Sequence, residues 1–331
     1  MNWFKYRLPN TDSKKNPVVS GASETLMKGL GQGFAVAPFF NPADGLFTIP
    51  CDFIPSPDDI DFSPSRIPFS TDPKDYFREI EAIKSELDGK RGKTVAARVI
   101  SVGKRIDINA TFSALCDEYQ DAFVFAFSSD VTGTWIGASP ELLLRVADNE
   151  VFSVALAGTR PASPDGCDPE WDIKNSDEQK MVEEFIRKRL QEKCTEVVAG
   201  NTFTKKAGAI EHICTPISAR LKQTDPSSLS NLLTALSPTP ALCGSNRDSS
   251  LRIIKEYESF DRELYGGFCG PNGIGGVTAF FVILRAAKCN PSGAAVFVGG
   301  GITPLSIAAD EWTETEMKSK TIINKLKTSE Q

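Results

Sequence analysis

The sequence predicts a single large α+β domain, in which mostly antiparallel β-sheets are flanked by helices. Many of the predicted strands adjoin one another, which favours antiparallel pairing between neighbours in the chain. The predicted helices come at irregular intervals, so a strict βαβ repeat is not supported. No internal repeat and no clear linker divides the 331 residues, a length that suffices for one large core. We therefore expect one domain over residues 1–331.

Residues 1–70 are rich in Pro, Gly, Asp and Ser and hold only short apolar runs, such as Phe34–Val36 and Leu46–Ile49. This composition is typical of edge strands and loops wrapped over a core, so we expect the catalytic motifs to lie in residues 75–331 or so. Strands are predicted at Thr94–Val102, Ala122–Phe127, Leu142–Val146, Val151–Leu156, Ile210–Thr215, Ala279–Ala286 and Ala294–Val298, and helices at about Pro73–Leu87, Asp177–Val197, Ser227–Leu236, Arg247–Ser259 and from near Asp310 onward.

Charge and hydropathy exclude several classes of function. The net charge is −6, and Lys and Arg are scattered without a basic block that carries interleaved aromatics, which argues against a nucleic-acid ligand. The first residues contain no apolar signal core, and no apolar run is long enough to span a membrane. We expect a cytoplasmic protein that binds neither nucleic acid nor membrane.

The eight cysteines, including Cys167, never form a CxxC pair, so we interpret them as reduced thiols that are mostly buried. The chain has a single histidine, His212, which makes a zinc site built from histidine and cysteine improbable. No Gly-x-Ser-x-Gly elbow accompanies that histidine, so a serine hydrolase is not indicated.

Glu178 occupies an unusual position on the helix predicted at Asp177–Val197. Met181, Val182 and Phe185 help to define the apolar face of this helix, and Glu178 points to the middle of that face at about 100° per residue. One interpretation is a first-turn glutamate favoured by the helix dipole. The other is an inward carboxylate reserved for a cation.

The C-terminal segment raises the same question. After the predicted strand Ala294–Val298, Gly299-Gly300-Gly301 is interpreted as a turn, and on the following helix Glu311, Glu314 and Lys318 recur on one side. These residues form either an exposed Glu-Lys pair worth about 0.3–0.5 kcal/mol or part of an enclosed polar site. Two helices that offer inward carboxylates fit a hard cation, and Mg²⁺ is the usual cellular choice.

Two further residues are candidates for proton transfer. Lys93 begins the strand Thr94–Val102; a lysine there usually extends into water, but an enclosed one becomes a usable general base. Glu141 follows Gly137-Ala-Ser-Pro at a bend from which a carboxylate could project into a cleft, although Pro-Glu is also common in ordinary turns.

Seven ordered blocks cover most of the chain from Lys93 onward. They are Lys93-Thr-Val-Ala-Ala-Arg, Gly137-Ala-Ser-Pro-Glu-Leu, Ala157-Gly-Thr-Arg-Pro, Lys174-x-x-Asp-Glu-Gln, Pro238-Thr-Pro-Ala, Glu258-Ser-Phe-Asp-Arg-x-x-Tyr-Gly-Gly, and Gly299-Gly-Gly-Ile through Glu311-Trp-Thr-Glu-Thr-x-x-Lys. Together they resemble the chorismate-utilising enzymes, which comprise isochorismate, salicylate, anthranilate and aminodeoxychorismate synthases. The resemblance implies the fold of anthranilate synthase component I and chorismate as substrate.

The resemblance also implies roles for individual residues. Glu178 and Glu314 match the family's Mg²⁺ carboxylates, with Glu311 beside them. Lys93 matches the general base of the members that add water to chorismate, and Glu141 matches the acid that protonates the departing hydroxyl. Residues that match substrate-binding or pocket-lining positions are His212, Thr239, Tyr265, Arg285, Gly300 and Lys318. One departure is Cys243-Gly244-Ser245-Asn246, which replaces a more usual Gly-Gly-x-Pro.

These matches favour an isochorismate synthase, an isomerase that moves a hydroxyl group. A salicylate synthase, which goes on to expel pyruvate, is the alternative. Anthranilate synthase component I comes third, since its members usually hold glutamine at the position of Lys93. Ala157 stands where aminodeoxychorismate synthases carry a nucleophilic lysine, which opposes that branch. By family analogy we expect a monomer without an obligatory glutaminase subunit, acting in menaquinone or siderophore synthesis.

Overall fold

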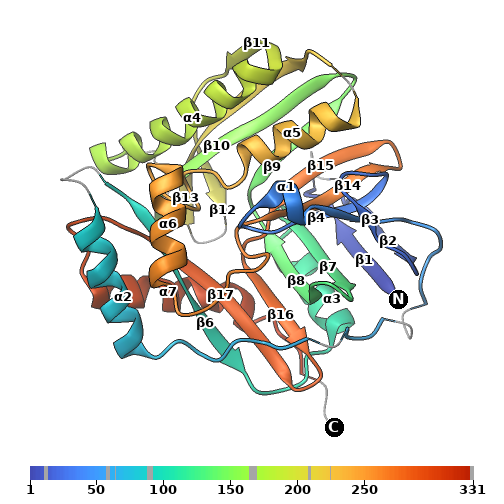
Figure 1. Ribbon diagram of the computed structural model, residues 1–331, viewed down its shortest axis with the longest axis horizontal. Helices are drawn as coiled ribbons and strands as arrows, with labels where there is room; N and C mark the ends of the chain where they lie inside the picture. The colour runs from blue at the N-terminus through green and yellow to red at the C-terminus, as the bar shows by residue number, and fades with distance from the viewer. Residues whose placement is uncertain are drawn as a thin grey trace.

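In a computed structural model, the chain forms two large β-sheets that pack face to face, with helices on both outer sides (Figure 1). Every pairing between the described strands is antiparallel, which confirms the predicted fold class. The structure describes residues 1–10, 14–56, 60–63, 65–87, 92–163, 170–207, 210–223 and 225–328. Cys167 and the side chain of Lys174 lie outside this description.

The first sheet contains, in spatial order, β2 (Val18–Ser23), β1 (Asn2–Arg7), β7 (Phe123–Ser129), β8 (Gly133–Ser139), β16 (Ala286–Asn290), β17 (Gly293–Ile302) and β6 (Thr94–Val102). The second contains β11 (Cys194–Ala199), β13 (Ile210–Leu221), β10 (Glu150–Pro161), β9 (Leu142–Ala147), β15 (Val277–Val282), β14 (Phe268–Ile274), β4 (Gly33–Ala37), β5 (Phe47–Ile49) and β3 (Met27–Lys28), while β12 (Phe203–Ala207) pairs with β13. Strands from the first and last thirds of the chain therefore share both sheets.

Aromatic side chains fill the space between the two sheets. Phe123 of β7 stacks on Phe281 of β15 with ring centroids 4.2 Å apart, and Phe4 of β1 stacks on Phe34 of β4 at 5.1 Å. Each such ring, fully removed from water, contributes about 1.5–3 kcal/mol. The N-terminal segment was expected to supply edge strands and loops. Strands β2 and β3 are indeed edge strands, but β1 and β4 lie inside the sheets and their aromatic side chains belong to the core.

Helices cover the outer faces of the sheets. On the second sheet α4 (Ile173–Lys193) and α5 (Pro226–Leu236) bury aliphatic side chains, and Figure 1 shows α4 along the long strand β10. On the first sheet α3 (Ile108–Glu118) and α7 (Ala308–Ile323) do the same. The helices α2 (Pro73–Glu86) and α6 (Arg247–Tyr257) pack beside β6, and the short α1 (Pro42–Gly45) touches α5. No helix among the described residues has the length and apolar character needed to cross a membrane.

Local sequence signals predicted the start or the bounds of two elements accurately. The Asp72 side chain accepts a hydrogen bond from the Lys74 amide and starts α2 at Pro73, as the capping pattern predicted. The strand predicted at Thr94–Val102 has these bounds in the structure. By contrast, the helix predicted at Asp177–Val197 runs from Ile173 to Lys193, because Asp172 caps it earlier and the following residues extend into β11. The sequence pattern did not predict α3, β8 or β14.

The residues Gly299-Gly300-Gly301 do not form a turn, contrary to the prediction. They belong to β17, where they pair with Ala97, Ala96 and Val95 of β6. None of the three has the positive φ that a glycine turn requires. Glycine is needed here because side chains of other elements occupy the space that a Cβ would fill.

The chain passes from one sheet to the other at two neighbouring points. Between β8 and β9 it crosses at Pro140–Glu141, and between β15 and β16 it crosses at Ile283–Arg285, within the region predicted as one strand at Ala279–Ala286. The two crossings are joined by backbone hydrogen bonds, from the Val282 amide to the Glu141 carbonyl (3.0 Å) and from the Ala138 amide to the Arg285 carbonyl (3.1 Å). Two predicted site residues, Glu141 and Arg285, are therefore brought together by sheet topology.

A buried ion pair anchors β6. The Arg262 guanidinium binds the Glu258 carboxylate at 2.5 Å, with only 1% and 2% of the two side chains exposed. Arg262 also donates to the Val95 carbonyl (2.7 Å), while Glu258 accepts from the Ala97 amide (2.8 Å). Removing either partner would leave a buried, unpaired charge, so this pair holds the start of β6 in one position.

Candidate active site

Lys93 lies just before β6 and points toward α4. Its backbone is held by Ser245, whose hydroxyl accepts from the Lys93 amide (3.0 Å) and whose own amide donates to the Lys93 carbonyl (2.9 Å). The ammonium binds the Glu178 carboxylate at 2.5 Å, and 14% of the lysine side chain is exposed. A Cβ on Gly301 would lie 2.3 Å from Lys93 Cε, so this glycine provides the space for the lysine. Lys93 is therefore enclosed and does not extend into water.

The carboxylates of α7 meet the neighbouring glycine. A Cβ on Gly300 would lie 3.1 Å from Glu311 Oε2 and 3.8 Å from Glu314 Oε1, so both carboxylates converge at this point of β17. Glu314 also binds Lys318 at 2.6 Å, and Lys318 donates to the Gly299 carbonyl (3.1 Å). The Glu314–Lys318 ion pair considered in the sequence is therefore present, and it lies against residues Gly299–Gly301 of β17.

The carboxylates offer oxygen donors to a hard cation, but they are already compensated in part. Glu178 is paired with Lys93, and Glu314 is paired with Lys318. Among the described residues, no three acidic, histidine or cysteine side chains gather closely enough to form a metal cage. The arrangement fits a cation that takes one or two carboxylates and completes its shell with water and substrate oxygens, as Mg²⁺ does. Such a cation would compete with the two lysines.

Glu141 is buried at the crossing between β8 and β9, with 7% of the residue exposed. Burial raises the pKa of Glu141 to about 7, and the nearby charge of Lys205 and the Thr239 hydroxyl oppose this rise. Within the described part of the chain, the Thr239 hydroxyl reaches no partner at normal hydrogen-bond geometry, so its effect on Glu141 is one of proximity. A carboxyl group with this pKa is protonated in a large fraction of molecules near neutral pH and can donate that proton.

His212 on β13 is surrounded by cations from three other elements. Its Nδ1 donates to the Gly158 carbonyl (2.8 Å), which leaves Nε2 as an acceptor. Burial lowers the pKa of His212, and the charges of Arg285, Lys318 and Lys205 lower it further, so the imidazole is neutral at neutral pH. Basic residues from β12, α7 and the second crossing thus meet around one uncharged ring, an environment suited to an anionic ligand.

Tyr265 is a further residue of the site and lies beside Gly299 of β17. Its hydroxyl lies 3.3 Å from the position of a Cβ on Gly299, and its ring stacks on Phe297 with centroids 5.6 Å apart. Contacts or nearby charges connect the predicted site residues to one another, with Lys93 and the α7 carboxylates approaching successive glycines of β17 from opposite faces of the strand. The links run from Glu178 through Lys93 and the glycines to α7, and from Lys318 through His212 to Arg285, Lys205, Glu141 and Thr239.

The family model described as "Chorismate binding enzyme" matches residues 62–327, which is most of the chain and includes every predicted site residue. The chain belongs to this family of chorismate-binding enzymes.

Similar proteins agree with this assignment. The chain is 35% identical to isochorismate synthase 2 (chloroplastic) of Arabidopsis thaliana over 68% of its own length and 42% of the relative. It is 31% identical to isochorismate synthase EntC of Escherichia coli (strain K12), over 70% of this chain and 61% of the relative. The chain therefore aligns with less than two thirds of these relatives.

Solved structures share the fold. The menaquinone-specific isochorismate synthase MenF of Escherichia coli superimposes with a TM-score of 0.81 at 21% identity, covering 99% of this chain and 89% of that one. Anthranilate synthase component I of Streptococcus pneumoniae superimposes with a TM-score of 0.69 at 17% identity, covering 96% of this chain and 89% of that one. At these identities the likeness establishes the fold alone.

Two features of this chorismate-binding enzyme escaped the sequence analysis. Lys205 lies near Glu141 and His212, but nothing in the sequence indicates that β12 pairs with β13 beside the site. The Glu258–Arg262 pair was recognised only as part of a block, because both residues lie beyond the end of α6 at Tyr257, where no helical spacing indicates an ion pair. The described cysteines are all free thiols, in line with the prediction.

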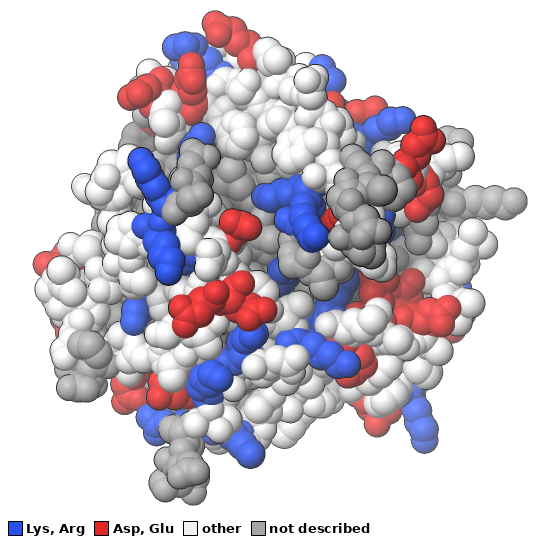
Figure 2. All heavy atoms as spheres, turned by 180° about the vertical axis from the view of Figure 1, so that it is seen from behind, with Lys and Arg blue, Asp and Glu red and all other residues white. Residues whose placement is uncertain are grey.

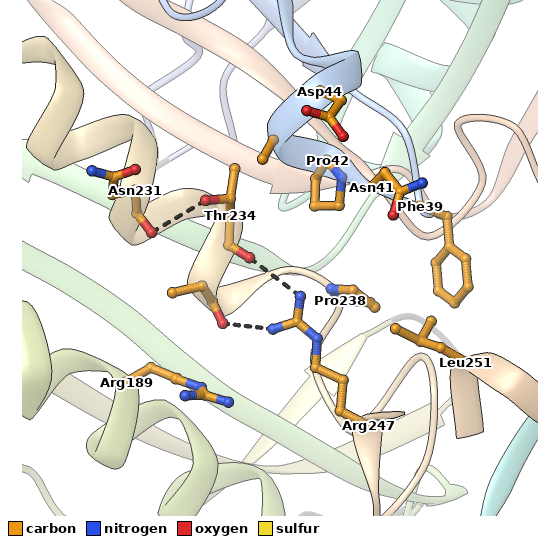
Figure 3. Close-up of a pocket in the computed structure, with 12 residues that line it drawn as sticks. Phe39, Asn41, Pro42, Asp44, Arg189, Asn231, Thr234, Pro238, Arg247 and Leu251 are labelled. Atoms are coloured by element: carbon orange, nitrogen blue, oxygen red, sulfur yellow. Dashed lines mark hydrogen bonds between the residues drawn. The ribbon is translucent and has the colours of Figure 1, made fainter. Parts of the chain in front are cut away.

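A separate cavity of about 420 Å³ lies between α1, α5 and α6 (Figure 3). Arg247 lines it and donates to the carbonyls of Ala235 (2.9 Å) and Ser237 (2.6 Å), so its guanidinium caps the C-terminal end of α5. The residues that line this cavity include none of the predicted site residues. This cavity is therefore separate from the place where the predicted catalytic and binding side chains lie.

Figure 2 shows the back of the molecule with acidic and basic side chains interspersed across the surface. A surface of mixed sign produces no strong long-range field. The face shown in Figure 2 therefore presents no broad field of one sign to an approaching anion.

Proposed function

We propose that this protein is an isochorismate synthase that converts chorismate to isochorismate. The observation that carries the proposal is a pair of proton-transfer groups in one site: Lys93, enclosed beside Gly301, and Glu141, buried with a pKa of about 7. Relatives named isochorismate synthase at 30–35% identity support the same reaction.

In the proposed reaction, Lys93 first gives up its ion pair with Glu178 and loses its extra proton to solvent. As a neutral amine it then takes a proton from a water molecule while the water oxygen bonds to C2 of the ring. Glu141 gives its proton to the C4 hydroxyl, the C4–O bond breaks, and water leaves while the ring double bonds shift. Base and acid act on different ring positions, so no covalent intermediate is needed. The proton gained by Lys93 later returns through solvent to Glu141.

Substrate binding is assigned to the cations and hydrogen-bonding groups of the site. Arg285 and Tyr265 hold a carboxylate of chorismate, with Tyr265 placed beside Gly299 and Arg285 near His212. Lys318, Thr239 and Gly300 line the remaining wall. Burial raises the pKa of Tyr265 to about 12, so its hydroxyl remains a donor at any physiological pH.

We also propose that Mg²⁺ is the cofactor, bound by Glu178 and Glu314, with Glu311 contributing through water. When bound, the ion would neutralise the ring carboxylate and withdraw charge from the ring. The support comes from the convergence of Glu311 and Glu314 on Gly300 and from the position of Glu178 beside Lys93. When the cation is absent, Lys93 compensates the charge of Glu178 and Lys318 compensates the charge of Glu314.

The deciding experiment is incubation of the purified protein with chorismate and Mg²⁺, followed by chromatographic separation of the products. Isochorismate alone supports the proposal. Pyruvate together with a fluorescent phenol would instead identify a salicylate synthase, and ammonia-dependent anthranilate would identify the third alternative. Lys93→Gln and Glu141→Gln are expected to abolish turnover while chorismate still binds in the presence of Mg²⁺. Near-normal turnover in either variant would overturn its assigned role.

The proposal extends to the setting of the enzyme. We propose a cytoplasmic monomer that needs no glutaminase subunit, because Lys93 suits attack by water. Isochorismate supplies both menaquinone and catechol siderophore synthesis, and the relatives include enzymes named for both routes. Sedimentation of the purified protein tests the oligomeric state.

A further inference from the structure

Lys205 is a basic residue of the site with no role in the proposed mechanism. It lies on β12, directly opposite His212 of β13 in the antiparallel register. Directly opposite residues of such a pair project to the same face of the sheet. Lys205 is half-buried, whereas its neighbour Lys206, opposite Glu211, projects to the other face and is exposed.

Within the residues that the structure describes, the charge of Lys205 is not committed to an ion pair. Lys93 binds Glu178, Lys318 binds Glu314, and Arg160 on the neighbouring strand binds Glu211. Lys205 makes no ion pair with any residue in the described part of the chain. A half-buried cation held in place without a carboxylate partner is suited to compensate a negative charge that appears only during the reaction.

The carboxyl group of Glu141 is the place where such a charge would appear. Lys205 shares the site with this carboxyl group: it lies opposite His212 in the register, and the crossing that carries Glu141 is hydrogen-bonded to the crossing that carries Arg285. The charge of Lys205 favours the ionised form of Glu141, and Thr239 is a further polar group close to it. Before the reaction burial favours the protonated form of Glu141. After the proton has left, the carboxylate is a buried anion, which is costly unless a positive charge lies nearby.

We propose that Lys205 is a positioning residue that stabilises the carboxylate which Glu141 becomes when its proton passes to the departing hydroxyl. The inference rests on the proposed function for the assignment of Glu141 as the acid. The step is balanced, since the C4–O bond breaks, the hydroxyl takes the Glu141 proton and leaves as water, and the negative charge stays on Glu141 beside the ammonium. Lys205 itself neither gives nor takes a proton.

Direct titration of Glu141 tests the interaction independently of turnover. The protein is labelled with ¹³C at the glutamate carboxyl carbons, and the Glu141 resonance is assigned from its absence in Glu141→Gln. We expect the titration midpoint to be higher in Lys205→Met than in the wild type. It should be unchanged in Lys206→Met, the matched control on the other face of β12, and largely restored in Lys205→Arg. A midpoint in Lys205→Met equal to that of the Lys206→Met control would overturn the proposal.

Kinetics then test the consequence for catalysis. With chorismate and Mg²⁺, Lys205→Met should lower kcat by about tenfold, which corresponds to about one pH unit at Glu141. The alkaline limb of its pH profile should also move to higher pH. Lys206→Met should match the wild type, and circular dichroism checks that all variants are folded. A shifted midpoint in a protein that does not convert chorismate would reject the proposed function while leaving the Lys205–Glu141 interaction established. A shifted midpoint with unchanged kcat and pH profile would reject the catalytic role of Lys205.

Discussion

The Lys93 ammonium and the Glu178 carboxylate form a 2.5 Å ion pair that joins the start of β6 to α4. The two residues lie in separate layers of the molecule, since β6 belongs to the first sheet and α4 covers the second. The pair links the proposed base to a proposed metal ligand. Binding of a cation at Glu178 and the freedom of Lys93 to approach water are therefore coupled through one carboxylate.

Gly301→Ala should displace Lys93. The added Cβ would lie 2.3 Å from Lys93 Cε, so the lysine has to move by an ångström or more. A displacement of that size costs roughly a hundredfold in rate when it affects a catalytic group. We expect kcat to fall by about this factor, measured as isochorismate formation. Gly103→Ala is the control, because a Cβ there meets nothing within 4 Å. Equal activity in the two variants would contradict the assigned position of Lys93.

The pH dependence of turnover should carry the signature of Glu141. Its pKa is raised to about 7 by burial, and the group acts as an acid only while it is protonated. The rate should therefore be lost as the pH rises above about 7, by about tenfold per pH unit well above the pKa. Initial rates between pH 5.5 and about 9.5 measure this limb, with the stability of the protein checked at each pH. A rate that stays constant up to about pH 9 would exclude Glu141 as the acid.

Mg²⁺ binding should respond oppositely to changes at the two ends of the Glu314–Lys318 pair. Glu314→Gln removes a ligand and should weaken Mg²⁺ binding by about tenfold or more. Lys318→Met removes the competing ammonium, which lies 2.6 Å from Glu314, and should strengthen Mg²⁺ binding in the absence of substrate. Calorimetry with Mg²⁺ alone measures both effects. Asp310→Asn, an exposed change on the same helix, should leave the affinity unaltered. Identical affinities in all these variants would exclude Glu314 as a ligand.

Glu79 on α2 should make the stability of the protein depend on pH. Burial raises the pKa of Glu79 to about 7, even though it accepts a hydrogen bond from the Ser259 amide (3.2 Å). Because the folded pKa exceeds that of the unfolded chain, stability from this group is full below about pH 4.5 and is lost as the pH rises through about 7. The loss is on the order of 1–3 kcal/mol.

Glu79→Gln should therefore raise the midpoint of thermal unfolding by a few degrees at pH 8.5 and change little at pH 5. Scanning calorimetry at the two pH values measures the difference. Glu81→Gln serves as the control, since the Glu81 side chain is 62% exposed and paired with Lys84 on the same helix. A stabilisation of equal size at both pH values would show that ionisation of Glu79 is not its cause.

Short-range patterns determined those elements whose signals lie within a few residues. Asp72 and Pro73 determine the start of α2, and the apolar run from Thr94 to Val102 determines β6. Short-range periodicity also identified Glu178 as a candidate site residue, because the local sequence alone shows a carboxylate among the apolar residues of a predicted helix. These features depend on capping, periodicity and side-chain type, which need no knowledge of distant partners.

Only the tertiary structure decided how these groups meet. The glycines Gly299–Gly301 form a strand and not a turn, because they pair with β6. Glycine is required at Gly300 and Gly301 because the α7 carboxylates and Lys93 lie where their Cβ atoms would be. Glu141 and Arg285 meet because the chain crosses between the sheets at two adjacent points, and Lys205 joins them because β12 pairs with β13. The sequence by itself determined the residue types that can perform the chemistry. Their arrangement followed from long-range strand pairing, which no local pattern encodes.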